Sequence, residues 1–210
     1  MTGFHASKVS QRLFIATFVS VVLLTPNTSS AAQEDVPYCH RYMDFNFPDY
    51  MALWNYDEPA LTATTFFAML NMASNSVDKT FYSELLSQIA RTFVMRESYD
   101  DARHFLGQAE LYLENAEPRA EVYYLREKAR LFTATDKPRE VEELLIHSWQ
   151  IANKEKYDQL AIETALDISE LKDLSLAKKI DWQKKARALA GITIDPRAQK
   201  WITENAYRFL

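Results

Sequence analysis

The sequence predicts an all-α protein in which antiparallel helix hairpins stack into an α-solenoid, and three observations lead to this prediction. Small and large apolar residues recur at helical spacing in two consecutive segments, 80–115 and 119–154. The 210 residues include only three glycines and seven prolines, which favours helices over a chain rich in tight turns. Short polar stretches interrupt each segment, as a hairpin requires. Such hairpins do not bury their apolar faces alone, so neighbouring hairpins are expected to stack.

The first hairpin, Thr80–Asn115, has small residues where its two helices would touch. Its turn is expected at Arg96 and Glu97, and Ser98 with Asp101 predicts a capping box at the start of the second helix. The apolar positions are Leu86, Ile89, Ala90 and Phe93 in the first helix and Tyr99, Ala102, Leu106 and Ala109 in the second. The alanines allow the two helices to approach closely, and the larger side chains fill the space between them.

The second hairpin, Arg119 to about Lys154, repeats this pattern with an offset of 39 residues, as between Ala102 and Val141. Its turn is expected at residues 135–138. The repeated positions are Leu125, Ala129 and Phe132 in the first helix and Val141, Leu145 and Ser148 in the second. A degraded third pair is expected over 157–171 and 174–190, and Asp195 with Pro196 predicts the start of a final helix.

Two segments precede the hairpins. A helix is expected from Asp57, as its N-cap, to about Met72. Residues 33–56 form a lead-in rich in tyrosine, phenylalanine and tryptophan. We expect this lead-in to pack on the first helix pair as an N-terminal cover; the alternative is that it occupies a binding groove and inhibits it. The helical repeat domain is therefore expected to span residues 57–210.

Residues 1–32 have the pattern of a secretory signal peptide. Lys8 and Arg12 precede an uncharged apolar run, Leu13–Leu24, and the small residues that end at Ala32 predict a cleavage site there. The run of 12 residues is short for a membrane span, although an uncleaved anchor is the alternative. The sequence thus predicts a periplasmic or secreted protein.

Composition argues against several classes of function. The net charge is −5, and removal of residues 1–32 would make it −7, which disfavours nucleic acid or an anionic membrane as the main partner. The scattered glycines exclude a phosphate-binding loop, and the histidines lack metal-ligand spacing, so no cofactor and no metal are expected. Cys39 is the only cysteine, so no internal disulfide is expected; a free thiol is favoured over a link between two chains.

Several stretches resemble a group of exported, uncharacterised bacterial proteins with tetratricopeptide repeats. These stretches are LWNYDEPA (53–60), ELLSQIAR (84–91), YYLREKARLF (123–132), SWQIA (148–152) and DPRAQKW (195–201). The resemblance covers most of residues 53–201 and implies an all-helical repeat fold, a bacterial source and no reaction. Relatives of this kind continue with further repeat helices, whereas this chain ends on an apolar helix at Leu210. That helix is expected to fold back, to pair with a second copy or to be the stump of a longer array.

Basic residues on the first helices are the sharpest candidates for a binding site. In the repeat, the residue after the close-contact alanine lines the concave groove; here these residues are Arg91 and Arg130, and Arg126 lies one turn before Arg130. Ser87 is equivalent to Arg126, and Tyr123 lies nearby. Three arginines in a groove suit a carboxylate of a peptide. The alternative is that they pair internally with glutamates three or four residues away.

The sequence therefore predicts a non-catalytic scaffold that binds a protein or peptide in the cell envelope. The expectation is that the protein is not an enzyme, because no catalytic motif is present. Two alternatives stay open: an all-helical enzyme or enzyme subunit without a recognisable motif, and an assembly subunit that pairs through its C-terminal helix, for example as a homo-oligomer.

Overall fold

The computed structural model describes residues 49–209, and the regular structure among them is entirely helical, so the all-α prediction is confirmed. The helices in chain order are η2 (Tyr50–Leu53), α1 (Pro59–Ala73), α2 (Thr80–Met95), α3 (Tyr99–Glu110), η3 (Leu113–Asn115), α4 (Pro118–Ala134), α5 (Pro138–Lys154), α6 (Asp158–Ser169), α7 (Leu176–Ile192), α8 (Pro196–Glu204) and η4 (Ala206–Phe209). The predicted signal peptide, Cys39 and residues 33–48 of the lead-in lie outside the described residues.

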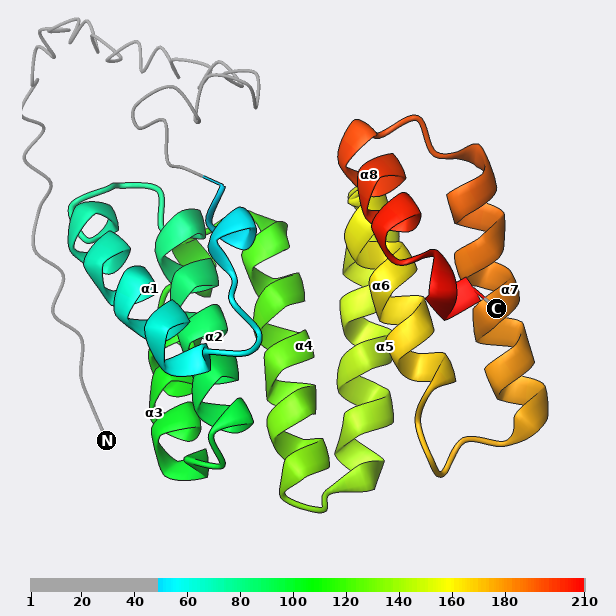
Figure 1. Ribbon diagram of the computed structural model, residues 1–210, viewed down its shortest axis with the longest axis horizontal. Helices are drawn as coiled ribbons and strands as arrows, with labels where there is room; N and C mark the ends of the chain where they lie inside the picture. The colour runs from blue at the N-terminus through cyan, green and yellow to red at the C-terminus, as the bar shows by residue number, and fades with distance from the viewer. Residues whose placement is uncertain (1–48, 210) are drawn as a thin grey trace, which may run out of the picture. The chain divides into compact units, whose positions relative to one another are not determined.

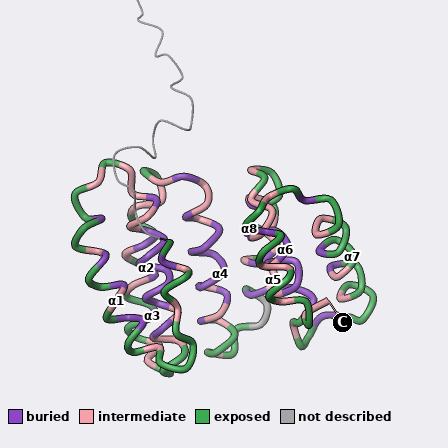
Figure 2. Tube along the Cα trace, turned by 45° about the horizontal axis from the view of Figure 1, so that its top comes forward, coloured by how far each residue is buried: buried purple, intermediate pink, exposed green. Residues whose placement is uncertain are grey.

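Neighbouring helices in the sequence are also neighbours in space. The pairs α2–α3, α4–α5 and α6–α7 pack most extensively. In addition, α5 packs against α6 and α2 packs against α4. Figure 1 shows these helices running in alternating directions. Buried residues are concentrated along α2, α4 and α6, whereas α7 is largely exposed (Figure 2). The helices α2, α4 and α6 therefore form the inner row of the described residues.

Three connections between helices share one turn geometry. The residues Glu97, Asp136 and Lys156 have positive φ angles of 60°, 56° and 62°. In each turn the next amide donates a hydrogen bond to the carbonyl five residues earlier, as from Ser98 to Phe93 at 2.9 Å. This is the Schellman motif, which normally places glycine at the left-handed position. Between residues 49 and 209 this motif forms three times without glycine, at a modest cost in backbone energy.

The small residues predicted at the hairpin contacts are buried, including Ala90, Ala102 and Ala129. A hydroxyl group also bonds across each of the two hairpins at equivalent positions. Ser83 on α2 donates to the carbonyl of Ala109 on α3 at 3.0 Å, and Ser148 on α5 donates to the carbonyl of Val122 on α4 at 3.2 Å. Because both pairs are offset by 39 residues, the two hairpins share one contact with donor and acceptor helices exchanged.

Two predicted caps are wrong and one is confirmed. Ser98 precedes α3, but its side chain makes no capping bond. Its backbone amide is already bonded to the Phe93 carbonyl in the turn, so the reciprocal bond of a capping box has no donor. Glu58, rather than Asp57, precedes α1. Asp195 caps α8 as predicted, since its carboxylate accepts a bond from the Arg197 amide at 2.9 Å.

The C-terminal helices fold back onto the chain. α8 packs against α6 and α7, with Ala198 fully buried and Trp201 and Ile202 partly buried in the cluster that contains Trp182. Arg187 donates to the carbonyl of Phe209 at 2.7 Å. Of the three expectations for this apolar end, folding back is therefore the one observed within the described residues. None of the helices between residues 49 and 209 combines the length and apolar character needed to cross a membrane.

Candidate functional site

The five residues selected from the sequence all lie on α2 and α4. They occupy three places along the inner row: Arg91 and Ser87 lie on α2, Arg126 and Arg130 lie between α4 and α6, and Tyr123 lines a pocket at the start of α4. The first two places adjoin, because Glu127 on α4 accepts a bond from Gln88 on α2 at 3.3 Å and also pairs with Arg130 at 2.8 Å.

At the first place, the end of the lead-in covers α2. Tyr50 is buried and its hydroxyl donates to Glu84 at 2.7 Å, while the indole of Trp54 donates to Gln88 at 3.1 Å. The Arg91 guanidinium lies 4.9 Å from the Trp54 ring centre and 5.2 Å from that of Tyr56, within cation–π range. Ser87, expected in the groove, is fully buried. Residues 50–56 thus cover the α2 surface on which the sequence predicted a groove.

At the second place, ion pairs connect α4 to α6. The Arg126 side chain is only 4% exposed and contacts Glu163 and Asp167, both at 2.8 Å. Arg130 contacts Glu127 at 2.8 Å and reaches Asp167 at 3.4 Å. Internal pairing thus accounts for both arginines. Arg130 pairs with Glu127, three residues away, as the alternative predicted, whereas the other two carboxylates, Glu163 and Asp167, belong to α6.

Arg208 extends this network from the C-terminal end. It contacts Asp167 at 2.9 Å and Glu170 at 2.8 Å, so Asp167 forms ion pairs with three arginines. Burial alone would raise the pKa of Asp167, but the attraction of Arg126, Arg130 and Arg208 outweighs burial and holds this pKa well below its ordinary value. Burial likewise opposes the charge on Arg126, and the nearby carboxylates reverse that effect and raise its pKa. Asp167 and Arg126 are therefore both charged at neutral pH.

A pocket of about 390 Å³ opens beside this network, between α4, the start of α5 and the α6–α7 connection. Arg126 and Arg130 line one side, and apolar side chains form its floor: Ala129, Val141, Leu145, Leu171 and Leu174. Charges of both signs, including Lys137, Glu142 and Lys172, surround the floor. We call this the α5-side pocket. Its composition suits an apolar side chain flanked by polar groups.

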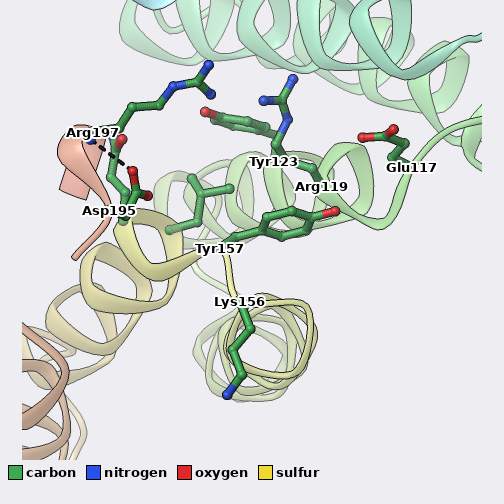
Figure 3. A pocket seen from close by; sticks show the side chains of 9 residues that line it. Glu117, Arg119, Tyr123, Lys156, Tyr157, Asp195 and Arg197 are labelled. Atoms are coloured by element: carbon green, nitrogen blue, oxygen red, sulfur yellow. Dashed lines mark hydrogen bonds between the residues drawn. The ribbon is translucent and has the colours of Figure 1, made fainter. Parts of the chain in front are cut away.

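A second pocket of about 380 Å³ lies at the opposite end of α4 (Figure 3). It is lined from the starts of three helices: Glu117, Arg119 and Tyr123 come from α4 and the residue before it, Tyr157 and Leu160 from the start of α6, and Asp195 and Arg197 from the start of α8. Figure 3 shows Tyr123 and Arg197 on one side of this space, while Lys156 extends away from it. We call this the α8-side pocket.

Sequence reasoning missed the acidic half of the network and the arginines beyond α4. A signal for the acidic half was present, because Glu163 and Asp167 are spaced four residues apart, as are Arg126 and Arg130. Two such pairs on facing helices are complementary. Nothing local marks Arg197 or Arg208, whose positions depend on how α8 folds back.

Within residues 49–209 no group of three or more histidine, cysteine, aspartate or glutamate residues could hold a metal ion. His104 and His147 are exposed on α3 and α5. No family model matches the chain, no curated protein is significantly similar to it, and no solved structure matches it.

Proposed function

We propose that this chain is a tetratricopeptide-like array of helix hairpins that binds a protein or peptide partner without catalysing a reaction. The proposed array is an α-solenoid of the exported bacterial group that the sequence resembles. Support comes from the 39-residue offset that relates the Ser83–Ala109 and Val122–Ser148 contacts and from the shared turn geometry at Glu97 and Asp136. A solenoid of this kind binds partners along its inner row of helices.

The observation that carries the proposal is the α5-side pocket beside Arg126 and Arg130. Its apolar floor is open, its rim is charged, and its volume of about 390 Å³ lies within the range of ligand sites. The guanidinium of Arg126 is committed to Glu163 and Asp167. The partner segment therefore inserts an apolar side chain, and its flanking polar groups meet the charged rim.

The signal sequence predicted in residues 1–32 supports action in the periplasm or outside the cell. The partner is accordingly expected among proteins of the cell envelope.

Site-specific photocrosslinking in the native host tests this function. A photoreactive residue at Thr133, which is exposed and lines the α5-side pocket, should give an adduct of defined mass with one envelope protein. The matched control carries the same residue at Gln150, which is exposed on α5 away from the pocket. No adduct at Thr133, or the same adduct at both positions, would contradict the proposal.

A further inference from the structure

The α8-side pocket has the polarity of an anion site, because three helices begin at its wall. α4, α6 and α8 start at Pro118, Asp158 and Pro196, and residues within the first turn of each line the pocket. Helix N-termini carry a partial positive charge and unpaired amide groups. No side chain forms a capping hydrogen bond at the start of α4 or of α6.

The hydroxyl group of Tyr123 faces the same pocket. The residue is only 8% exposed, it lines the pocket, and no group among residues 49–209 hydrogen-bonds its hydroxyl. In Figure 3 this hydroxyl points toward the Arg197 side chain, which lies on the same side of the pocket. Burial raises the pKa of Tyr123 far above its ordinary value, with a further contribution from the charge of Glu84, so the hydroxyl keeps its proton. A hydroxyl that opens into the pocket and has no protein acceptor is available to donate to a ligand there.

Charged side chains of both signs line the pocket around this hydroxyl: Arg119, Arg197, Glu117 and Asp195. The Arg197 guanidinium is exposed and makes no ion pair within the described part of the chain. The Arg119 guanidinium forms two bonds to Glu84, at 2.7 and 3.2 Å, which fix its position at the wall. Of the two carboxylates at the wall, that of Asp195 caps α8 and that of Glu117 is buried beside the start of α4. Arg197 is the exposed cation that a negative ligand would meet.

We propose that the α8-side pocket binds an oxyanion, either a carboxylate or a phosphate group, through the Tyr123 hydroxyl and the Arg197 guanidinium. The oxyanion can belong to a small organic ligand or to the end of a peptide, because the volume of about 380 Å³ exceeds that of the anionic group alone. Tyr157 and Leu160 supply an apolar wall for the remainder of the ligand. This inference does not depend on the proposed scaffold function, whose pocket lies at the other end of α4.

Calorimetric titration of the full chain tests the proposal with three probes: inorganic phosphate, acetyl-trialanine with a free carboxylate, and the corresponding amide. We expect phosphate or the free carboxylate to bind, with an affinity that falls as salt is added. Preference for the free carboxylate over the amide identifies a peptide end, and binding of phosphate with no response to either peptide identifies a phosphate group. Either pattern supports the proposal, and no binding of any probe overturns it.

Two variants assign the binding to the pocket. Tyr123→Phe keeps the ring and removes only the hydroxyl, and Arg197→Gln removes an exposed charge that the fold does not use; each should weaken binding about tenfold or more. Lys200→Gln removes one charge from the same helix outside the pocket, and should bind as the parent does. Equal binding by the parent and both pocket variants, or equal loss in Lys200→Gln, would overturn the assignment, and circular dichroism of each variant checks its folding.

Discussion

Neighbouring helices of the inner row are held together in two different ways. α2 packs directly on α4, whereas α4 and α6 are joined by ion pairs. The equivalent positions are Ser87 on α2 and Arg126 on α4, which differ by 39 residues. Ser87 is fully buried and its hydroxyl bonds within its own helix to Ser83, so α2 packs closely on α4. Arg126 instead reaches across to Glu163 and Asp167, and α4 and α6 pack less closely.

The difference shows how one side chain sets the spacing of a helical array. A serine at this position leaves room for direct packing, and the lead-in covers that region. Arg126 instead spans the gap between α4 and α6 with its side chain, so the two helix backbones stay farther apart. A pocket opens toward each end of α4. Both pockets proposed as binding sites therefore lie beside the α4–α6 junction, where the helices are bridged by charge rather than packed directly. Five experiments test this comparison.

Removing the shared carboxylate should have the largest effect. Asp167→Asn leaves Arg126, Arg130 and Arg208 without their common partner, and breaking a buried ion pair in this way costs about 3 kcal/mol or more in the free energy of unfolding. Urea denaturation measures this loss. The control Glu170→Gln removes an exposed carboxylate that contacts only Arg208 and should cost about 0.5 kcal/mol. Equal costs would show that the network does not hold α6 in place.

Acid should weaken the α4–α6 junction through the same carboxylate. Because the pKa of Asp167 is lower in the folded than in the unfolded chain, its contribution to stability is complete above about pH 4 and is lost as the pH falls toward the folded-state pKa. The unfolding free energy measured from pH 6 to pH 2 should therefore fall below about pH 4. This fall should be shallower in Asp167→Asn, and identical slopes in the two proteins would contradict the argument.

Overfilling the α2–α4 junction should have an intermediate effect. Ser87→Leu adds volume at a fully buried position and should cost about 1–3 kcal/mol, because well-packed helices do not separate freely. Thr64→Leu, on the exposed side of α1, serves as the control and should change the melting temperature little. If Ser87→Leu melts at the parent temperature, the two helices are not in direct contact at this position.

The two hydroxyl contacts should be worth similar amounts. Ser83→Ala and Ser148→Ala each leave a buried carbonyl without its donor, at a cost of about 1–2 kcal/mol. Because the contacts are equivalent by the 39-residue offset, urea denaturation should give similar losses for both. A loss in only one of the variants would show that the hairpins are less alike than their spacing indicates.

Glycine at the left-handed turn positions should have the smallest effect, and it should be stabilising. Glu97→Gly and Lys156→Gly remove the strain of a positive φ angle and should raise the free energy of unfolding by about 0.5–1 kcal/mol. Asp136→Gly should gain less, because aspartate tolerates this conformation better. Melting temperatures rank the three, and a loss of stability in all three would mean that the side chains contribute contacts of their own.

Much of the fold follows from the sequence because it depends on neighbours along the chain. The paired helices, the turn at Glu97 and the cap at Asp195 are set by backbone preferences and by bonds that span a few residues. Ala90 and Ala102 are buried where their spacing predicts, because small residues at a contact allow two helices to approach closely. The predicted capping box at Ser98 does not form, because the Ser98 amide that it requires is already bonded to the Phe93 carbonyl in the preceding turn.

The sequence by itself determined which segments are helical, where most of them begin and end, and that charged residues lie on the first helix of each pair. Only the tertiary structure decided what those charges contact. Arg126 meets Asp167, and Tyr123 shares a pocket with Arg197, across separations of 41 and 74 residues along the chain. Such contacts depend on the angle and distance at which whole helices pack, and these are set by the summed burial of many side chains rather than by any local pattern.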